Sequence, residues 1–460
     1  MAGTYKRLYF FGSTAYVVML MLSALFYKER IIFIDTAYTI FHIVKDNTFS
    51  IETFRFGEIA TQVLPVLTRK PCLPLNVITL SYSIGFVLYY FTCYVIAGSV
   101  LKRYDFALII LLLNILFVSD TFFWIQSELP QSIALLMVVF AFVSKLEYKN
   151  TKLFTWLLLL VSLSVLAFFH PLLVFVIIYC SIFFLNREQA IIDRRLLFAI
   201  LIFYCTAVLI KALLFRTTYE THSFSGLKNF VALFPDYFSI YSNKRFLNNI
   251  LSKYYWILLF FLTIVVFYCT KKEWRKLVVF ISFFGGYLML INVSYPTKTT
   301  AECYMENLYL PLSVFLSLPL VFDMLPLLKQ KQGASLVMAI LVLSCTFRIY
   351  STSTKYVARL NWERSFLSKN ENKKLIVDAA RAKADILEML WGTPYEFWLL
   401  STIEKGTSAS IIIDETPAQR AWASEKKKSL IVNWNIYPYT ELNPKYFHFT
   451  DTTSGYIVDQ

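Results

Sequence analysis

Long apolar runs separated by short polar segments fill most of the first three quarters of the chain. A helix needs about 20 mostly apolar residues to cross a bilayer, so the pattern predicts about eleven membrane-spanning helices. The first run follows two basic residues and has no small-residue cleavage site after it, so we expect an uncleaved span and not a signal peptide. The runs lie at residues 8–26, 76–99, 105–118, 129–144, 153–169, 171–185, 196–215, 255–269, 277–291, 309–327 and 334–347.

Basic residues in the short connecting segments predict the orientation, because cytoplasmic loops carry an excess of Lys and Arg. A cytoplasmic N-terminus places basic residues in every inner segment, beginning with Lys6 and Arg7 and continuing with Lys102 and Arg103. The outer loop at 119–128 then has no Lys or Arg, and the one at 292–308 has only Lys298. This topology places the C-terminus outside the cytoplasm.

Three long polar segments face outward in this topology. Two are the loops at 28–75 and 216–254, and the third is the tail at 349–460. Long ordered loops between spans are usually functional. We therefore expect a transmembrane domain at 1–348 and an extracytoplasmic C-terminal domain at 349–460.

The tail reads as a small α/β domain. Short apolar segments at 373–380, 408–415, 428–434 and 445–451 predict strands, and 382–403 predicts a helix that is broken near Gly392-Thr393-Pro394. About 110 residues are enough for such a domain to have its own core.

Composition supports a membrane protein. Hydrophobic residues make up 57% of the 460 residues and charged residues only 16%, whereas soluble domains have about 25% charged residues. The mean hydropathy is +0.57. The net charge of +14 comes from basic loops, and no basic tract with interleaved aromatics is present, so we expect no nucleic-acid partner.

The first outer loop contains an amphipathic segment, IIFIDTAYTIFHIV at 31–44, whose apolar spacing predicts a helix lying in the membrane interface. Asp35 lies near its start. Asp35 is either an N-cap of this helix or a carboxylate held at the outer surface of the first span. Charges at 50–70, including Glu52, Arg55 and Glu58, are expected to form a solvated face.

Other polar residues flank the outer ends of the predicted spans. Glu128 and Gln131 begin one span, and His170 ends another. Ionisable residues at membrane depth usually line a cavity or pathway, although Glu128 also suits a helix N-terminus and His170 an interfacial position. A dense polar cluster before a late span contains Lys298, Glu302, Tyr304 and Glu306.

Arg216 opens the second long loop. Arg binds phosphate with a bidentate fork, so this residue either contacts a phosphate-bearing lipid or anchors a helix end. Cys72 and Cys303 are the cysteines placed outside the membrane, and the sequence leaves open whether they pair.

The layout resembles the GT-C superfamily of integral membrane glycosyltransferases. The points of similarity are the inside N-terminus, the large first outer loop with an acidic residue at Asp35, the multi-span core and the outer C-terminal domain. The stretch ENLYLPL at 306–312 also resembles the start of a late span in bacterial members. Many members carry a pair of acidic residues in the first loop, but Thr36 and Ala37 follow Asp35 here.

The resemblance implies a bacterial inner-membrane enzyme that transfers a sugar from a polyprenyl-phosphate donor to a glycan, lipid or protein acceptor on the outer face. Membrane lipids would surround it. The resemblance specifies no cofactor and leaves a divalent metal open. Asp35 would be the general base that activates the acceptor hydroxyl. Arg216 or Lys298 would neutralise the leaving phosphate. The residues that would bind the sugar or orient the base are Glu128, Gln131, His170, Glu302, Tyr304 and Glu306.

Two alternatives remain at this point. A polysaccharide polymerase or ligase shares the lipid-linked substrate but uses Arg in place of a carboxylate. A lipid-linked glycan transporter would show inverted repeats and broken helices at the midplane, but no clear repeat is present in the sequence.

Overall fold

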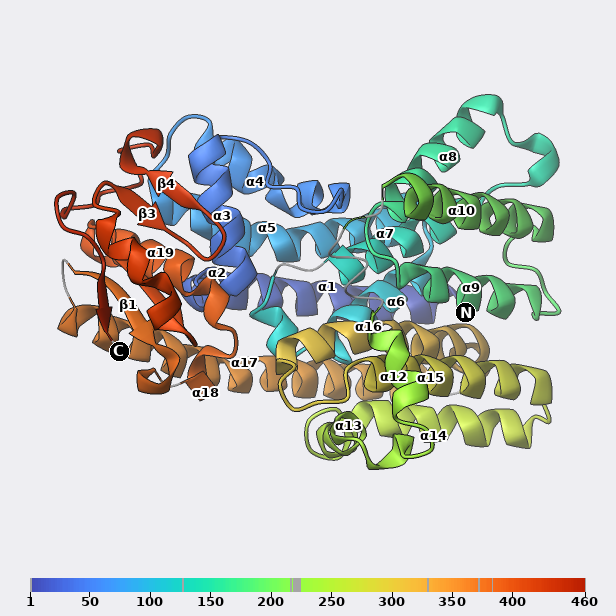
Figure 1. The fold of residues 1–460 in the computed structure, drawn as a ribbon. Coiled ribbons are helices and arrows are strands. Elements are labelled where there is room, and N and C mark those ends of the chain that lie inside the picture. Colours follow the sequence, from blue (N-terminus) through green and yellow to red (C-terminus); the bar gives the residue numbers. More distant parts are fainter. Residues whose placement is uncertain are drawn as a thin grey trace.

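The computed structural model describes residues 2–125, 128–215, 217, 225–328, 331–370, 373–382 and 384–459. The chain is mostly helical and has a small region of sheet near its C-terminus (Figure 1). The α-helices in the first half are α1 (Ala2–Leu25), α2 (Tyr27–Ile31), α3 (Ile34–Asp46), α4 (Ile59–Arg69), α5 (Leu75–Val95), α6 (Tyr104–Ile115), α7 (Glu128–Val143), α8 (Leu153–Ala167), α9 (Leu173–Leu185) and α10 (Arg194–Leu214).

The second half contains further helices and the five strands found among the described residues. The helices are α12 (Asn229–Ala232), α13 (Tyr241–Ser252), α14 (Tyr255–Thr270), α15 (Trp274–Ser294), α16 (Glu302–Leu318), α17 (Lys331–Lys369), α18 (Ala384–Leu387) and α19 (Thr393–Lys405). The strands are β1 (Lys374–Asp378), β2 (Ser410–Asp414), β3 (Ser429–Ile431), β4 (Ile436–Pro438) and β5 (Ile457–Asp459).

Each predicted apolar run coincides with a helix, but the helices differ in length. Among the described residues, six helices are long and apolar enough to cross a membrane, and the count becomes seven if α13 and α14, which meet at a bend of 91°, form one span. Four other apolar helices, α6 to α9, have only 10–17 residues. The number and composition of these helices are those of an integral membrane protein. Helix length supports six or seven spans.

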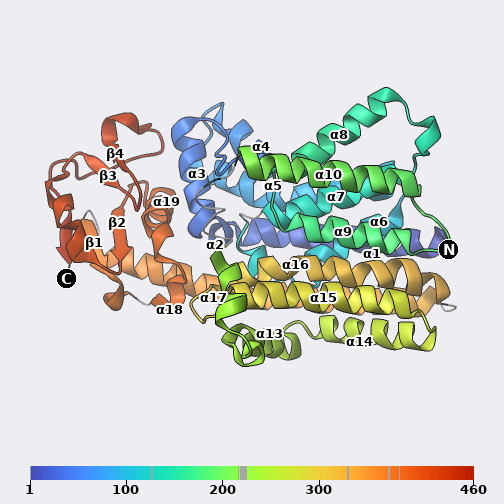
Figure 2. The same cartoon turned by 45° about the vertical axis from the view of Figure 1, so that its right-hand side comes forward.

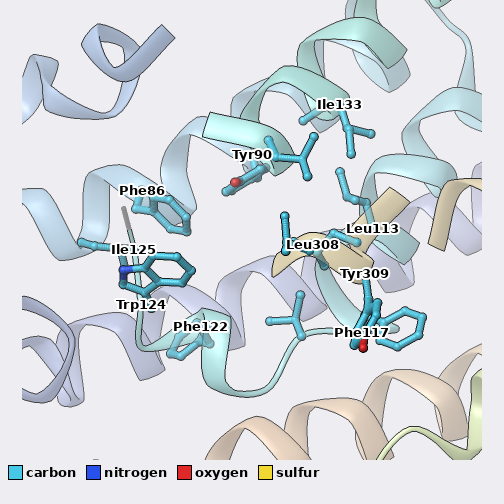
Figure 3. Close-up of a cluster of buried hydrophobic side chains, with 14 of the residues drawn as sticks. Phe86, Tyr90, Leu113, Phe117, Phe122, Trp124, Ile125, Ile133, Leu308 and Tyr309 are labelled. Atoms are coloured by element: carbon cyan, nitrogen blue, oxygen red, sulfur yellow. The ribbon is translucent and has the colours of Figure 1, made fainter. Parts of the chain in front are cut away.

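The outward faces of these helices are apolar. On α8, for example, Leu153, Phe154 and Val161 are largely exposed. Exposed apolar surface of this extent is unfavourable in water and suits contact with lipid. Between the helices lies a continuous buried core, part of which is drawn in Figure 3, where Phe86, Phe122 and Trp124 lie among aliphatic side chains.

The first loop and the C-terminal region lie at the same end of the molecule. In Figures 1 and 2 the helices α2 to α4 lie beside β3, β4 and α19, whereas the N-terminus lies at the opposite end of the helical bundle. Direct packing joins the two segments, since Phe41 of α3 contacts Tyr395 and Trp398 of α19. This end of the molecule carries the cavity described below.

The C-terminal region is a small α/β unit. Its three-stranded parallel sheet has the order β2-β1-β5, with Leu375 of β1 opposite Ile411 of β2 and Ile457 of β5. An antiparallel hairpin, β3-β4, lies beside it, and α19 packs on β2. The strands predicted at 373–380, 408–415 and 428–434 are confirmed, as is the helix break near Pro394, where α19 begins.

The strand predicted at 445–451 is wrong. This segment consists of turns and irregular backbone, and the third strand of the parallel sheet is β5. Phe447 stacks on Trp398 of α19, and Tyr446 lies under the guanidinium of Arg69 in α4. The apolar residues of the segment therefore anchor the C-terminal region to the first loop in place of pairing with a strand.

Helix α17 crosses the predicted domain boundary at residue 348 without a break, because it runs from Lys331 to Lys369. Arg348 is nearly buried at this level and donates to the carbonyl oxygens of Leu116 and Val118, at the C-terminal end of α6. A continuous helix thus leads from the bundle into the C-terminal region.

Candidate functional site

A cavity of about 620 Å³ lies where the first loop, the helical bundle and the C-terminal region meet. Its wall combines acidic, basic, aromatic and aliphatic side chains. The polar and aromatic lining residues are Asp35, Tyr38, Thr39, Glu52, Thr53, Arg55, Glu58, Trp124, Glu128, His170, Ser294, Tyr295, Tyr304, Asn307, Trp391 and Trp434. The aliphatic and other apolar ones are Pro171, Leu172, Phe175, Leu227, Leu290, Ile291, Leu308 and Met389.

Asp35 lies in the first turn of α3 and faces this cavity. Phe33 is the N-cap residue of α3 and makes no side-chain cap, so the capping interpretation of Asp35 is wrong. The carboxylate instead accepts a hydrogen bond from the indole N–H of Trp124, with 2.7 Å between Nε1 and Oδ2. Burial raises the pKa of Asp35, and despite the hydrogen bond from Trp124 the value is about 7.

The backbone before Asp35 is strained and is held by the C-terminal region. Ile34 has φ +38°, a conformation that a β-branched residue rarely adopts. Its N–H donates to Glu396 Oε1 of α19 at 2.6 Å, and Arg359 of α17 pairs with the same carboxylate. Gly392 packs so closely that a Cβ atom there would lie 2.7 Å from the Cα of Ile34. Contacts from α17 and α19 thus fix the start of the helix that carries Asp35.

A second acidic group at the cavity is the carboxyl pair of Glu58 and Glu128. Burial and the neighbouring carboxylate of Glu128 raise the pKa of Glu58 far above its ordinary value. The raised pKa favours the protonated form of Glu58, which shares a hydrogen bond with Glu128. Arg55 completes the group with an ion pair to Glu128, at 3.0 Å between Nη1 and Oε2.

His170 occupies the turn between α8 and α9, next to this carboxyl pair. Burial lowers the pKa of His170 to about 3, and Arg55 lowers it further while Glu128 opposes the shift. The ring nitrogen Nδ1 accepts from the backbone N–H of Leu172 at 3.2 Å. The ring is therefore neutral, and its proton lies on Nε2, which makes Nε2–H a hydrogen-bond donor.

Three apolar helices contribute another part of the cavity wall. Phe175 belongs to α9, Leu290 and Ile291 to α15, and Leu308 to α16. These helices belong to the part of the molecule that has lipid-compatible outer faces. The cavity therefore joins a charged end at the first loop to an apolar side at the helical bundle.

The predicted site residues divide into two groups. The cavity brings together Asp35, Glu128, His170 and Tyr304. It does not bring in Gln131, Lys298, Glu302 or Glu306, none of which lines its wall. Arg216 lies outside the described residues.

Three of the residues away from the cavity have local explanations. Lys298 is exposed in the loop before α16. Gln131 is buried behind the cavity wall and donates to Thr61. Glu302, in the first turn of α16, accepts from Asn249 at 3.2 Å.

Glu306 is buried inside a dense network of hydrogen bonds. Its carboxylate accepts from the backbone N–H groups of Ser119, Asp120 and Thr121 at 2.7 to 3.0 Å. The hydroxyls of Thr121 and Tyr254 also donate to it. The carboxylate thus satisfies the backbone of the turn between α6 and α7, which explains a conspicuous polar residue in an apolar helix.

Sequence reasoning missed several lining residues. Arg55 and Glu58 were expected on a solvated face, but Glu58 is buried and both reach the cavity. Trp124 was not singled out, although it contacts Asp35 directly. Gly57, between two of these residues, packs against Phe169 so closely that a Cβ would lie 2.1 Å from the ring. The sequence feature that could have indicated these residues is a glycine in a segment where acidic and basic residues alternate.

The described residues contain no group of three or more His, Cys, Asp or Glu side chains arranged to hold a metal ion. The carboxylate of Glu128 is already paired with Arg55, so the donor set at the cavity suits hydrogen bonding better than metal ligation. Cys72 and Cys303 are both free thiols and do not pair.

No family model matches the chain, and neither a curated protein nor a solved structure matches it. The arguments for function therefore rest on the cavity and its chemistry.

Proposed function

We propose that this chain is a GT-C-type membrane glycosyltransferase that transfers a sugar from a polyprenyl-phosphate donor to a glycan, lipid or protein acceptor. The supporting observation is the cavity itself. The carboxylate of Asp35, which has a raised pKa, lines the charged part of this cavity, and apolar side chains of the helical bundle line another part. An amphiphilic donor, with a sugar phosphate joined to a long hydrocarbon, matches that combination of surfaces.

The proposed topology extends this reading to the whole chain. All eleven apolar runs cross or enter the membrane, with α6 to α9 forming short or tilted spans. The N-terminus is cytoplasmic, and the first loop and C-terminal region face outward from a bacterial inner membrane. The positions of these two segments at one end of the molecule, opposite the N-terminus, support this arrangement (Figure 2).

The chemistry is a direct displacement. Asp35 removes the proton from the acceptor hydroxyl as that oxygen forms a bond to the anomeric carbon. The bond between the anomeric carbon and the phosphate oxygen breaks, and polyprenyl phosphate leaves with the electron pair. A pKa of about 7 suits a general base that works near neutral pH.

Arg55 and His170 are the groups that suit the donor phosphate. Lys298 was expected there, but it is exposed and lies outside the cavity wall. The guanidinium of Arg55 lines the cavity, and Nε2–H of the neutral His170 ring adds a donor without adding charge. Glu128 holds Arg55 in place through their ion pair.

The test is Asp35→Asn in the full chain reconstituted in lipid nanodiscs. Purified protein is incubated with radiolabelled hexoses and pentoses on polyprenyl phosphate, and sugar transfer and release are measured. Loss of the base should lower the rate by about 100-fold or more. The substitution keeps an oxygen that accepts from Trp124, so the variant should fold.

Asp46→Asn is the matched control, because Asp46 is in the last turn of the same helix and pairs with Lys45 at the surface. Its turnover should equal that of the wild type. Unchanged turnover in Asp35→Asn would remove Asp35 from the mechanism. If Asp35→Asn kept full turnover while Arg55→Lys abolished it, the polymerase or ligase mechanism would replace the one proposed.

A further inference from the structure

An exposed tryptophan stands at the mouth of the cavity. Trp434 lies in the turn between β3 and β4, and 63% of its surface is exposed. It nevertheless lines the cavity together with Trp391, and the two ring centroids are 5.0 Å apart with 38° between the planes. Exposing a large aromatic side chain to solvent is unfavourable, so its position beside a cavity suggests that it binds a ligand.

The surrounding structure presents the Trp434 ring from a defined backbone. The hairpin pairs Leu430 with Tyr437, and the N–H of Val432 donates to the carbonyl of Asn435 across its turn. Trp391 in turn precedes α19 and packs against α3 through Tyr38. The aromatic pair therefore has a fixed position relative to the helix that carries Asp35.

Tyr38 completes the aromatic cluster and links it to an acidic group. Its ring lies nearly perpendicular to those of Trp391 and Trp434, with centroid distances of 6.0 Å and 6.4 Å. Its hydroxyl donates to Glu52 Oε1 at 2.7 Å. Glu52 also lines the cavity, so the cluster offers flat aromatic faces beside a carboxylate that accepts hydrogen bonds.

We infer that Tyr38, Trp391 and Trp434, with Glu52, form a binding subsite for a neutral carbohydrate chain. Sugar rings carry C–H groups on one face and hydroxyls at the rim. The C–H groups pack on the electron-rich face of an aromatic ring, and the hydroxyls donate to carboxylates. Glu52 disfavours an anionic ligand at this subsite because like charges repel.

The occupant is the sugar acceptor of the reaction, and this assignment of a role rests on the proposed function. Tyr38 lies one turn of helix beyond Asp35 on α3, so a chain resting on the cluster brings its end near the general base. The subsite thus makes a glycan the favoured acceptor. The C-terminal region would select this acceptor, while the helical bundle would hold the lipid donor.

The subsite is tested by saccharide binding to the full chain in nanodiscs, measured by isothermal titration calorimetry. The probes are di- to tetrasaccharides of glucose, galactose, mannose and arabinose, without lipid or phosphate. At least one should bind the wild type, and Trp434→Ala should weaken that binding by about 10-fold. Trp434→Tyr keeps an aromatic face and should restore most of the affinity.

Trp422→Ala is the matched control, because Trp422 is an exposed tryptophan of the same region, at 43%, that does not line the cavity. Its saccharide affinity should equal that of the wild type. The inference is overturned if no saccharide binds the wild type, or if Trp434→Ala binds as tightly as Trp422→Ala.

The same variants separate this inference from the proposed function. In transfer assays, Trp434→Ala should raise the KM for a glycan acceptor and leave the KM for the lipid donor unchanged. Trp434-dependent binding without any transfer would refute the glycosyltransferase and keep the subsite. Transfer that depends on Asp35 with an unchanged acceptor KM in Trp434→Ala would refute the subsite alone.

Discussion

Two groups of acidic residues lie near the first loop, and they differ in what surrounds them. Asp35, Glu58 and Glu128 border a cavity, and Asp35 receives one side-chain hydrogen bond, from Trp124. Glu306 borders no part of that cavity and accepts five hydrogen bonds from residues 119–121 and Tyr254. Glu58, Glu128 and Glu306 are all buried, and Asp35 is partly buried. The difference lies in the space beside the carboxylate. Asp35 borders a cavity and is accessible for chemistry, whereas Glu306 is fully occupied by hydrogen bonds that stabilise the fold.

Asp120, next to Glu306, strengthens the contrast. Burial alone would raise the pKa of Asp120, but Lys253 and Lys355 more than offset this effect and lower it to about 2. This carboxylate remains charged through paired cations. Asp35 lacks such a close ion pair among the described contacts, and its pKa moves in the opposite direction. The surroundings of Asp35 and Asp120 thus shift the pKa values of the two carboxyl groups in opposite directions.

The largest effect expected from this comparison is on stability. Glu306→Ala leaves three backbone N–H groups and the Tyr254 hydroxyl buried without their acceptor, which should cost about 3–5 kcal/mol of unfolding free energy. Thermal unfolding in detergent measures the loss. Glu302→Ala, four residues earlier on the same helix and partly exposed, should change the stability by less than about 1 kcal/mol. Equal losses in both variants would contradict the distinction.

The next effect is on the pH dependence of transfer. Asp35 must be deprotonated to act as a base, so kcat/KM should rise with pH and level off above about 7. Below that value the rate should fall about tenfold per pH unit, reaching about 100-fold at pH 5. A pH–rate profile between pH 5 and 9 checks this. A profile flat down to pH 5 would show that the titrating base has an ordinary carboxyl pKa.

The sequence predicted the parts of this picture that depend on local pattern. The apolar runs predicted the helices, and Asp35, which follows the first run, lines the cavity. Contacts between distant residues were out of reach. Arg55 meets Glu128 across 73 positions, and Ile34 meets Glu396 across 362. Glu306 drew notice because it is polar in an apolar helix, but no local pattern reveals which backbone groups it serves.

A smaller effect is expected where the C-terminal region supports Asp35. Glu396→Ala removes the acceptor for the Ile34 N–H, so the strained start of α3 should relax and move the carboxylate. We expect kcat to fall by about 10-fold, with the KM for the lipid donor unchanged, because misplacement of a catalytic group slows the chemical step. Glu396→Gln keeps an accepting oxygen and should recover most of the rate. A loss of equal size in both variants would indicate that the charge pair with Arg359, and not the bond to Ile34, is what matters.

The smallest effect distinguishes the two members of the carboxyl pair. Glu58 already carries a proton, so Glu58→Gln replaces a neutral donor by another neutral donor and should change kcat/KM by less than about 2-fold at pH 7.5. Glu128→Gln instead removes the anion that holds Arg55 and should reduce transfer far more. Measuring both variants under one set of conditions is informative because their side chains touch each other and share one proton. A severe loss in Glu58→Gln would mean that Glu58 acts as an anion during turnover. In that case the proton of the pair would belong to Glu128, and the assignment of Arg55 to the donor phosphate would have to change with it.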